Sequence, residues 1–323
     1  MMRSIGRRGF AGLAAGGVMT PYLVRAQDAP SKQVRIVVPY PAGGATDIVA
    51  RLIAPRLGER WKQTVIIDNK PGASGILGSE IVARSAGDGA TLLMTTAAHT
   101  INPFFAKSLP YDTLRDFKPI TMVVAVANTL VGSVKAGFDN AESFLAAARS
   151  TPGKYQFGST ENTSRIVGEL FRVRSGLAID NVAYKGSVPM LQDLAAGHIP
   201  VGFTSPPSVL AHHRAGTIRM LAIGGTKRLT ALPDVPTMEE AGVSGMDQSS
   251  WLSLFGPASL PPSMATRIRA DVVDVLAEAP VLARIHDLAS EPGGEPPEAF
   301  AQRIRTELAL WQEIARIAGI VPE

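Results

Sequence analysis

Two hydrophobic periodicities alternate along this chain between residues 34 and 318. Short apolar runs rich in β-branched residues predict buried strands, and the segments between them carry apolar residues at helical spacing. Because strands and helices alternate, we expect an α/β fold with mostly parallel sheets flanked by helices, and a ligand outside the carboxyl ends of the strands. The expected strands are 34–38, 65–67, 91–95, 155–157, 179–184, 199–203, 218–223 and 251–255, and the expected helices are 48–57, 74–84, 141–149, 165–174, 188–196, 209–214, 264–277, 281–288 and 298–318.

The connections between these elements predict two domains. Residues 120–134 read as two extended pieces broken near Asn128, which indicates a crossing between domains, and the strand at 251–255 is expected to return. Two lobes joined by two crossing strands leave a ligand cleft that can close by a hinge motion. We expect lobe 1 to comprise 27–125 plus 249–323, and lobe 2 to comprise 126–248.

A glycine pair follows the first predicted strand. Gly43 and Gly44 allow backbone conformations closed to other residues and let a ligand approach the main chain, and Thr46 or Asp47 is expected to cap the next helix. The first N–H groups of a helix lack partners within it, so a strand, a glycine turn and a helix start together favour an anion. No Lys-Ser/Thr pair follows the glycines and the spacing is not the dinucleotide fingerprint, so a carboxylate fits better than a nucleotide. An ordinary turn between a strand and a helix is the alternative.

Other connections carry weaker local signals. Ser74 follows a second glycine turn at 69–75 and is expected to cap the next helix. Residues 96–102 are expected to form a polar loop. Asp139 with Glu142 predicts a capping box at the start of the first helix of lobe 2.

The first 26 residues have the pattern of an export signal. Arg7 and Arg8 form a twin-arginine pair, an apolar run follows at 11–19, and small residues around Ala26 offer a cleavage site. We therefore expect a periplasmic protein that is exported by the twin-arginine route and cleaved near Ala26.

Charge and cysteine content narrow the chemistry. The predicted leader carries four arginines and no acid, and without them basic residues equal the 28 acidic residues, so the basic pI of about 9.4 indicates no nucleic-acid partner. The chain has no cysteine, which excludes disulfides and thiol catalysis, and its five histidines lack paired ligand spacing. We expect neither a metal nor a cofactor.

The motifs, taken in order, resemble those of the extracytoplasmic solute-binding proteins of tripartite tricarboxylate transporters, the Bug family. The resemblance implies a periplasmic-binding-protein-like fold of two α/β lobes, a cleft for a small organic carboxylate such as a di- or tricarboxylate or an aromatic acid, and delivery to integral-membrane permease subunits by a monomer. It rests on PYPAGGATD at 39–47, NKPGA at 69–73, INP at 101–103, LPYD at 109–112, DF at 116–117, PGK at 152–154, FGS at 157–159, YKGS at 184–187, DL at 193–194, ALPDVPT at 231–237, EAG at 240–242 and Trp251.

Two departures from the family pattern fall in lobe 2. The loop 160–165 lacks the usual glycines, and Arg165 stands near a position often held by His. Thr204 stands where the family tends to carry Asp. The loss of an acid and the gain of a cation favour a ligand with more negative charge. The alternatives are a solvated arginine at a helix start and a neutral residue at a strand end.

The expected site is a cleft for carboxylate binding without catalysis. Backbone N–H groups near the glycine pair are expected to hold one carboxylate, directly or through water. Two alternatives are a hydrolase built on Ser159 and His99, for which the sequence lacks a G-x-S-x-G elbow, and a binding protein that presents its ligand to a membrane sensor. The expected ligand-binding residues are Tyr40, Gly43, Gly44, Ala45, Thr46, Asp47, Ser74, Gly75, Ala98, His99 and Asn102 from lobe 1, and Ser159, Thr163, Arg165, Gly186 and Thr204 from lobe 2.

Overall fold

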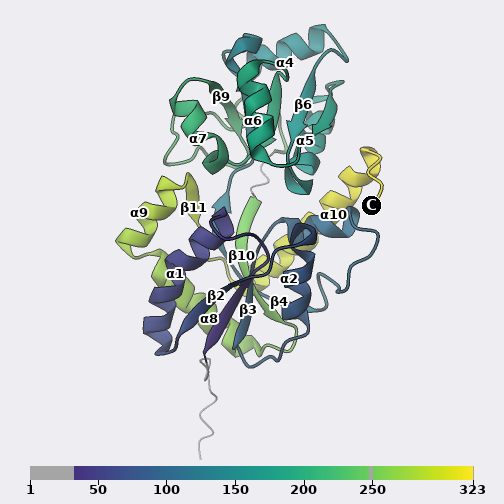
Figure 1. The fold of residues 1–323 in the computed structure, drawn as a ribbon. Coiled ribbons are helices and arrows are strands. Elements are labelled where there is room, and N and C mark those ends of the chain that lie inside the picture. Colours follow the sequence, from purple (N-terminus) through teal and green to yellow (C-terminus); the bar gives the residue numbers. More distant parts are fainter. Residues whose placement is uncertain (1–32, 247–249, 323) are drawn as a thin grey trace, which may run out of the picture.

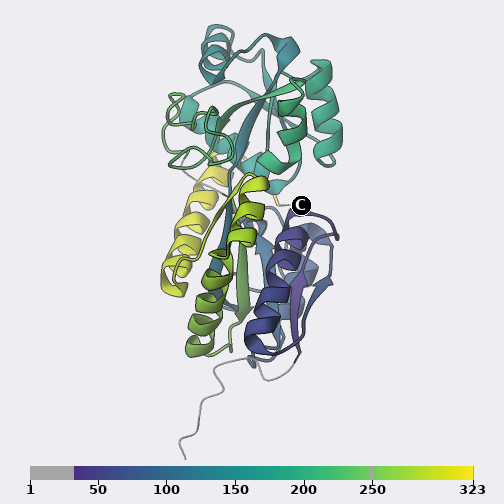
Figure 2. The same ribbon diagram turned by 90° about the vertical axis from the view of Figure 1, so that its left-hand side faces the viewer.

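The computed structural model describes residues 33–246 and 250–322. They form two sheets, each flanked by helices, in two lobes that lie end to end (Figures 1 and 2). The predicted export signal at 1–26 lies outside the described residues. The α/β fold class with two lobes is confirmed, whereas the residue limits expected for the lobes stay a prediction.

The first lobe is built on a six-stranded sheet in the order β11-β4-β10-β3-β1-β2. Alternate residues of β1 enter different apolar clusters, Val34, Ile36 and Val38 on one face and Val37 on the other, so helices bury the sheet from both sides. The strands are β1 (Val34–Val38), β2 (Val65–Asn69), β3 (Thr91–Thr96), β4 (Phe117–Val126), β10 (Ser250–Pro257) and β11 (Ser290–Pro292), and the helices are α1 (Ala45–Trp61), α2 (Ile76–Ala83), α3 (Ala98–Ile101), α8 (Pro262–Leu276), α9 (Ala279–Asp287) and α10 (Pro297–Ile317), with short 3₁₀ turns at Ala73–Gly75 and Asn102–Phe104.

The second lobe is built on a five-stranded sheet in the order β7-β6-β8-β5-β9. Gly197, in the left-handed conformation that favours glycine, is the C-cap of α6. The strands are β5 (Thr129–Ser133), β6 (Gln156–Ser159), β7 (Asp180–Ala183), β8 (Val201–Thr204) and β9 (Ile218–Ile223), and the helices are α4 (Ala141–Ser150), α5 (Asn162–Ser175), α6 (Ser187–Ala196) and α7 (Pro206–Arg214), with a 3₁₀ turn at Val134–Ala136.

Both sheets are mixed, which corrects the expectation of mostly parallel pairing. β1 pairs in parallel with β2 and β3, and β6 pairs in parallel with β7 and β8. The remaining pairs in both sheets are antiparallel. The reason is connectivity: β4 leads the chain away from the first sheet and β10 returns to it, so these neighbours must run in opposite directions.

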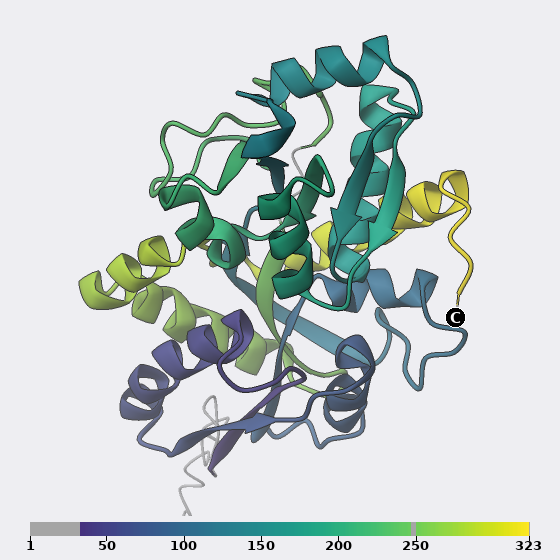
Figure 3. The same cartoon turned by 45° about the horizontal axis from the view of Figure 1, so that its top comes forward.

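The two lobes share apolar packing on one side. A single cluster of buried side chains includes Trp251 and Phe300 of the first lobe and Phe171 and Phe203 of the second. α10 runs from the first lobe alongside α5 of the second (Figures 1 and 3). Relative motion of the lobes therefore has to pivot about this packed side.

Two local expectations were wrong. Most of the residues expected as a polar loop at 96–102 are helical: 98–101 form α3 and Asn102 begins the 3₁₀ turn, because His99, Thr100 and Asn102 are buried in a packed environment that their polarity does not reveal. The capping box of α4 uses Asn140 and Ser143, one residue beyond Asp139 and Glu142. Asn140 has the extended backbone that an N-cap requires, and its side chain accepts a hydrogen bond from the Ser143 N–H.

Candidate functional site

The glycine pair forms the turn between β1 and α1. Gly43 has φ +83°, a left-handed conformation that favours glycine, whereas Gly44 is extended with φ −73°. Gly44 is the N-cap of α1, so the expectation that Thr46 or Asp47 caps this helix was wrong. Asp47 instead occupies the third helical position, from which its carboxylate reaches back to accept a hydrogen bond from the Gly43 N–H at 2.8 Å.

Asp47 holds this turn in place. Its carboxylate accepts hydrogen bonds from Arg51 Nε and Asn69 Nδ2, both at 3.0 Å. Asn69 Nδ2 also donates to the Tyr40 carbonyl at 3.1 Å, which joins the turn to the end of β2. The hydrogen bond from Arg51 and those from Gly43 and Asn69 lower the pKa of Asp47 to about 2. The buried Asp47 carboxylate is thus committed to the backbone of the turn.

The start of α1 leaves backbone donors available. The Gly43 N–H is taken by Asp47, and the Gly44 N–H makes a long contact of 3.4 Å with the Pro41 carbonyl. Within the described part of the chain, the N–H groups of Ala45 and Thr46 have no hydrogen-bond partner, and Ala45 is exposed. Two adjacent free N–H groups at the positive end of a 17-residue helix form a physical site for an anion.

The Tyr40 side chain links the same turn to the end of β3. Its hydroxyl lies 2.8 Å from Thr96 Oγ1 and 3.3 Å from Thr95 Oγ1, at the end of β3. Burial raises the pKa of Tyr40, and the negative charge of Glu161 in the second lobe raises it further. Glu161 therefore lies close to Tyr40 across the boundary between the lobes.

The second glycine turn, at 69–75, lines one side of a shallow hollow. Ser74 does not cap α2, contrary to expectation, because Ser74 itself has a left-handed backbone (φ 52°) and Gly75 (φ 90°) is the N-cap. Asn102 Nδ2 donates to the Ser74 carbonyl at 3.0 Å. Ser74, Asn102 and Phe105 line a hollow of about 200 Å³ together with Asn162 of the second lobe.

Ala98 and His99 do not reach this hollow. Both are buried in α3, and the His99 ring packs among Tyr111, Phe117 and Phe255. Burial lowers the pKa of His99 to about 3, so the ring is neutral at physiological pH. Neither of its nitrogens has a hydrogen-bond partner among the described residues.

Among the described residues, the Ser159 hydroxyl is not hydrogen-bonded to a histidine, as the nucleophile of a hydrolase would be. It donates to Asn181 Oδ1 at 2.7 Å, and Ser159 is buried at the end of β6. With His99 enclosed by aromatic rings, the structure does not bring this serine and histidine together as a nucleophile and base.

The second lobe offers a small polar hollow of about 70 Å³ beside the crossing strands. Thr163 and Thr204, both expected in the site, line it, whereas Gly186 is the N-cap of α6 with φ 105° next to the lining residue Ser187. Eight of the lining residues carry hydroxyl groups, and no lysine or arginine is among them. The lining residues are Val126, Asn128, Thr160, Glu161, Thr163, Ser164, Ser187, Thr204, Ser205, Ser208 and Ser250.

Arg165 points away from that hollow. Its guanidinium lies over the Phe105 ring, 5.5 Å from the ring centroid, and Phe105 belongs to the first lobe. The Arg165 Nε is buried without a hydrogen-bond partner in the described structure. The cation that was expected to attract negative charge therefore contacts the other lobe.

Glu161 is the residue that sequence reasoning missed. It is the N-cap of α5 and forms a capping box with Ser164: the Glu161 N–H donates to the Ser164 hydroxyl at 3.1 Å, and the Glu161 side chain accepts a hydrogen bond from the Ser164 N–H. Its side chain is exposed to solvent at the hollow, yet the surrounding protein displaces enough water to raise its pKa. The sequence marks the loop 160–165 as altered, but no local signal shows that its acid lies near Tyr40 of the opposite lobe.

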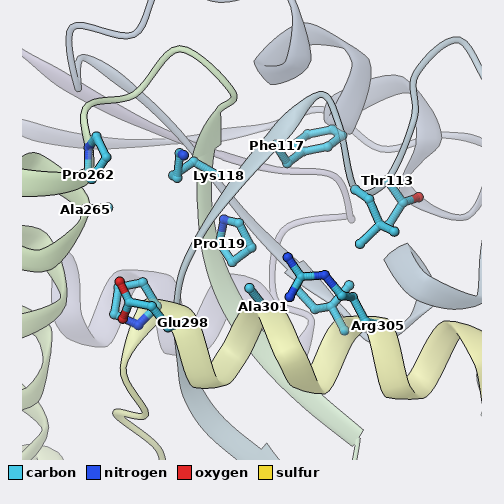
Figure 4. Close-up of a pocket in the computed structure, with 12 residues that line it drawn as sticks. Thr113, Phe117, Lys118, Pro119, Pro262, Ala265, Glu298, Ala301 and Arg305 are labelled. Atoms are coloured by element: carbon cyan, nitrogen blue, oxygen red, sulfur yellow. The ribbon is translucent and has the colours of Figure 1, made fainter.

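A larger hollow of about 320 Å³ lies elsewhere on the first lobe (Figure 4). It is lined by the starts of α8, α10 and β4, with Lys118, Glu298 and Arg305 around it. None of the expected site residues lines it. The described residues contain no cluster of three or more potential metal ligands, and none of their helices combines the length and apolar character needed to cross a bilayer.

The two-lobed fold is that of periplasmic solute-binding proteins, as related solved structures described as a periplasmic transporter and as the periplasmic binding protein BugD show. The model of the tripartite tricarboxylate transporter family receptor matches residues 49–319, and the chain belongs to that family. A relative described as a UPF0065 protein in the tcbD-tcbE intergenic region of Pseudomonas sp. strain P51 is 33% identical over 320 residues, which cover 97% of this chain and 95% of the relative.

Solved structures with bound acids share the fold. Rpa4515 of R. palustris with adipate is 33% identical, with a TM-score of 0.78 over 91% of this chain and 99% of that chain. MatC of Rhodopseudomonas palustris with bound malate is 26% identical, with a TM-score of 0.74 over 88% of this chain and 99% of that chain.

Proposed function

We propose that this protein captures a small organic carboxylate in the periplasm and that the N–H groups of Ala45 and Thr46 hold the carboxylate. The observation that carries the proposal is the pair of unpartnered N–H groups at the start of α1, in a turn fixed by Asp47. Adipate and malate in related structures support an acid as the ligand class. Ser74 and Asn102 on one side, and Thr163 and Thr204 on the other, complete the proposed cleft.

The bound acid is delivered to the integral-membrane permease subunits of a tripartite transporter, as membership of the receptor family supports. The protein acts as a monomer, is exported by the twin-arginine route through Arg7 and Arg8, and performs no catalysis. Presentation of the ligand to a membrane sensor is the alternative output. Replacement of Arg7 and Arg8 by Lys tests the export route, and normal periplasmic accumulation of that double variant would refute it.

A thermal-shift screen tests the carboxylate. Mature protein is heated with adipate, malate and shorter dicarboxylates, and in parallel with the corresponding diamides, which have similar shape and no charge. A ligand at a hundredfold its dissociation constant adds about 2.7 kcal/mol to the free energy of unfolding, which the screen detects. Equal stabilisation by acids and diamides would contradict anion binding at a helix start.

Proline substitution then tests the donors themselves. Ala45→Pro removes the Ala45 N–H at the first helical position, where proline fits a helix and where Gly44 is already extended, so the fold should persist. Affinity for the best acid should fall about tenfold or more, because a charged acceptor loses a donor. Ala45→Ser is the matched control, since it keeps the N–H. Unchanged affinity of a folded Ala45→Pro protein would remove this turn from the site.

A further inference from the structure

The proposed cleft has walls of opposite electrostatic character. The first-lobe wall offers the N–H groups of Ala45 and Thr46 at the positive end of α1. The second-lobe wall offers the Glu161 carboxylate, with hydroxyl groups around it and no cation among the lining residues. A ligand that spans both walls therefore meets a site for negative charge at one end and a negative side chain at the other.

Glu161 has no counter-ion in the described structure. No ion pair involves it, and the nearest cationic residue along its helix, Arg165, stacks on Phe105 instead. The raised pKa of Glu161 agrees with a carboxylate that is partly removed from water without a compensating cation. The side chain stays exposed to the hollow, so a ligand group can reach it.

A second carboxylate would be poorly placed in this hollow. It would face Glu161 in a confined space, and two like charges that share a site oppose each other's ionisation. A protonated amine would instead form a charge-assisted hydrogen bond with Glu161 and find hydroxyl acceptors on Ser187, Thr204 and Ser205.

We propose, resting on the proposed function, that the ligand carries a cationic amine as well as a carboxylate, with the carboxylate at the start of α1 and the amine at Glu161. This assignment replaces the expectation of a more negatively charged ligand, which combined a cation at Arg165 with the loss of an acid at Thr204. Arg165 contacts Phe105 instead, and Glu161 supplies an acid to the hollow that Thr204 lines. It makes Glu161 the residue that separates amino acids from dicarboxylates in this chain.

Calorimetry with matched probes tests the proposal. Three pairs share a chain length and differ only at one end: 4-aminobutanoate and succinate, 5-aminopentanoate and glutarate, 6-aminohexanoate and adipate. Hexanoate reports the carboxylate end alone, and 2-aminohexanoate reports whether the amine must be distant from the carboxylate. At least one amino acid should bind about tenfold or more tightly than its dicarboxylate partner.

Glu161→Gln supplies the decisive variant. It should erase the preference for the amino acid, shifting the ratio of the two affinities about tenfold or more, while hexanoate binding stays unchanged. Glu142→Gln is the matched control, because Glu142 is an exposed acid in the first turn of α4 in the same lobe and does not line the hollow. Circular dichroism confirms that both variants are folded.

The outcomes separate the two proposals. Tighter binding of every dicarboxylate than of its amino acid partner, or an affinity ratio unaffected by Glu161→Gln, overturns the amine assignment and leaves the carboxylate site standing. Absence of binding by every acid, hexanoate included, overturns both.

Discussion

The starts of α1 and α5 occupy the same place in the two lobes, and the two carboxylates near them are used differently. Each helix follows the central strand of a parallel triplet, β2-β1-β3 in one sheet and β7-β6-β8 in the other. Asp47 is buried, hydrogen-bonded by Gly43, Arg51 and Asn69, and its pKa is lowered to about 2. Glu161 is exposed, lacks an ion pair in the described structure, and its pKa is raised.

The same topology thus places a buried acid that fixes a turn in one lobe and an exposed acid in the other. In the first lobe the Asp47 carboxylate accepts the Gly43 N–H and so fixes the glycine turn. The N–H groups of Ala45 and Thr46, which come next, have no hydrogen-bond partner in the described structure. In the second lobe the Ser164 hydroxyl performs the holding, through the N–H groups of Thr160 and Glu161. The Glu161 side chain also accepts a hydrogen bond from the Ser164 N–H in a capping box, and as an exposed carboxylate it keeps acceptor capacity toward the cleft.

Removal of Asp47 should have the largest effect. Asp47→Ala leaves the Gly43 N–H and one Asn69 Nδ2 hydrogen without their acceptor in a partly buried network, so we expect a loss of about 2–3 kcal/mol in the free energy of unfolding together with loss of acid binding. Urea denaturation and calorimetry measure the two effects. Asp139→Ala, which breaks an exposed pair with Arg219, is the control and should change stability by less than about 1 kcal/mol. Comparable effects of the two variants would contradict the holding role.

A third carboxylate, Glu307 of α10, extends the comparison to a fully enclosed site. It accepts hydrogen bonds from Trp251 Nε1 at 3.0 Å and from Thr100 Oγ1 at 3.2 Å, and burial raises its pKa to about 7. Arg303 nearby favours the charged form and Glu295 disfavours it. Removal from water thus outweighs the nearby Arg303 and moves the Glu307 pKa upward, in the same direction as the pKa of Glu161.

The pH dependence of stability follows from the sign of the Glu307 shift. Between the unfolded pKa near 4.5 and the folded pKa near 7 the native state binds more protons than the unfolded state. Stability should therefore fall as pH rises from 5 to 8, by on the order of 2–3 kcal/mol for this group alone. Glu307→Gln should flatten the curve of melting temperature against pH. A wild-type curve that rises through this window, with the variant parallel to it, would contradict the assignment.

Much of the fold could be predicted from the sequence, since apolar periodicity reports local burial. The break between β4 and β5 near Asn128 and the stop of α6 at Gly197 are encoded by neighbouring residues. The antiparallel strands were missed because pairing is decided by where the chain returns, which no window of sequence contains. α3 was missed because its polar side chains are buried by packing against distant parts of the chain, as Thr100 is against Glu307.

In the candidate site too, features set by neighbouring residues could be predicted, whereas contacts between distant residues could not. Gly43 signals a left-handed turn locally, and the structure has it. The partnership of Asp47 with Asn69, and the approach of Glu161 to Tyr40, join residues far apart in sequence and depend on the folded arrangement. Residue types alone also could not show that His99 lies inside an aromatic cluster and that Arg165 faces Phe105.

The two glycines of the α1 turn should respond unequally to the same change. Gly43→Ala forces a left-handed conformation on a residue with a Cβ, although the space around it is open, and should lower stability by about 1–2 kcal/mol and shift the turn. Gly44→Ala keeps an extended backbone, and its new Cβ would make an ordinary contact of 3.4 Å with the Pro41 carbonyl, so the cost should be smaller. Urea denaturation of the pair measures the difference, and equal costs would show that backbone conformation is not what selects glycine at residue 43.

The smallest effect concerns the contact between the lobes, where Arg165 lies over Phe105. Arg165→Ala removes a partly exposed cation–π contact and should lower stability by about 0.5–1 kcal/mol. A double-mutant cycle with Phe105→Leu, which keeps an apolar side chain without the ring, isolates the pair from other losses. A coupling free energy of that size, with affinity for the best ligand changed by less than about threefold, would identify Arg165 as a contact between lobes and leave charge selection to Glu161. Zero coupling combined with a large loss of affinity would show instead that Arg165 contacts the ligand. The contrast between the starts of α1 and α5 would then no longer account for selectivity.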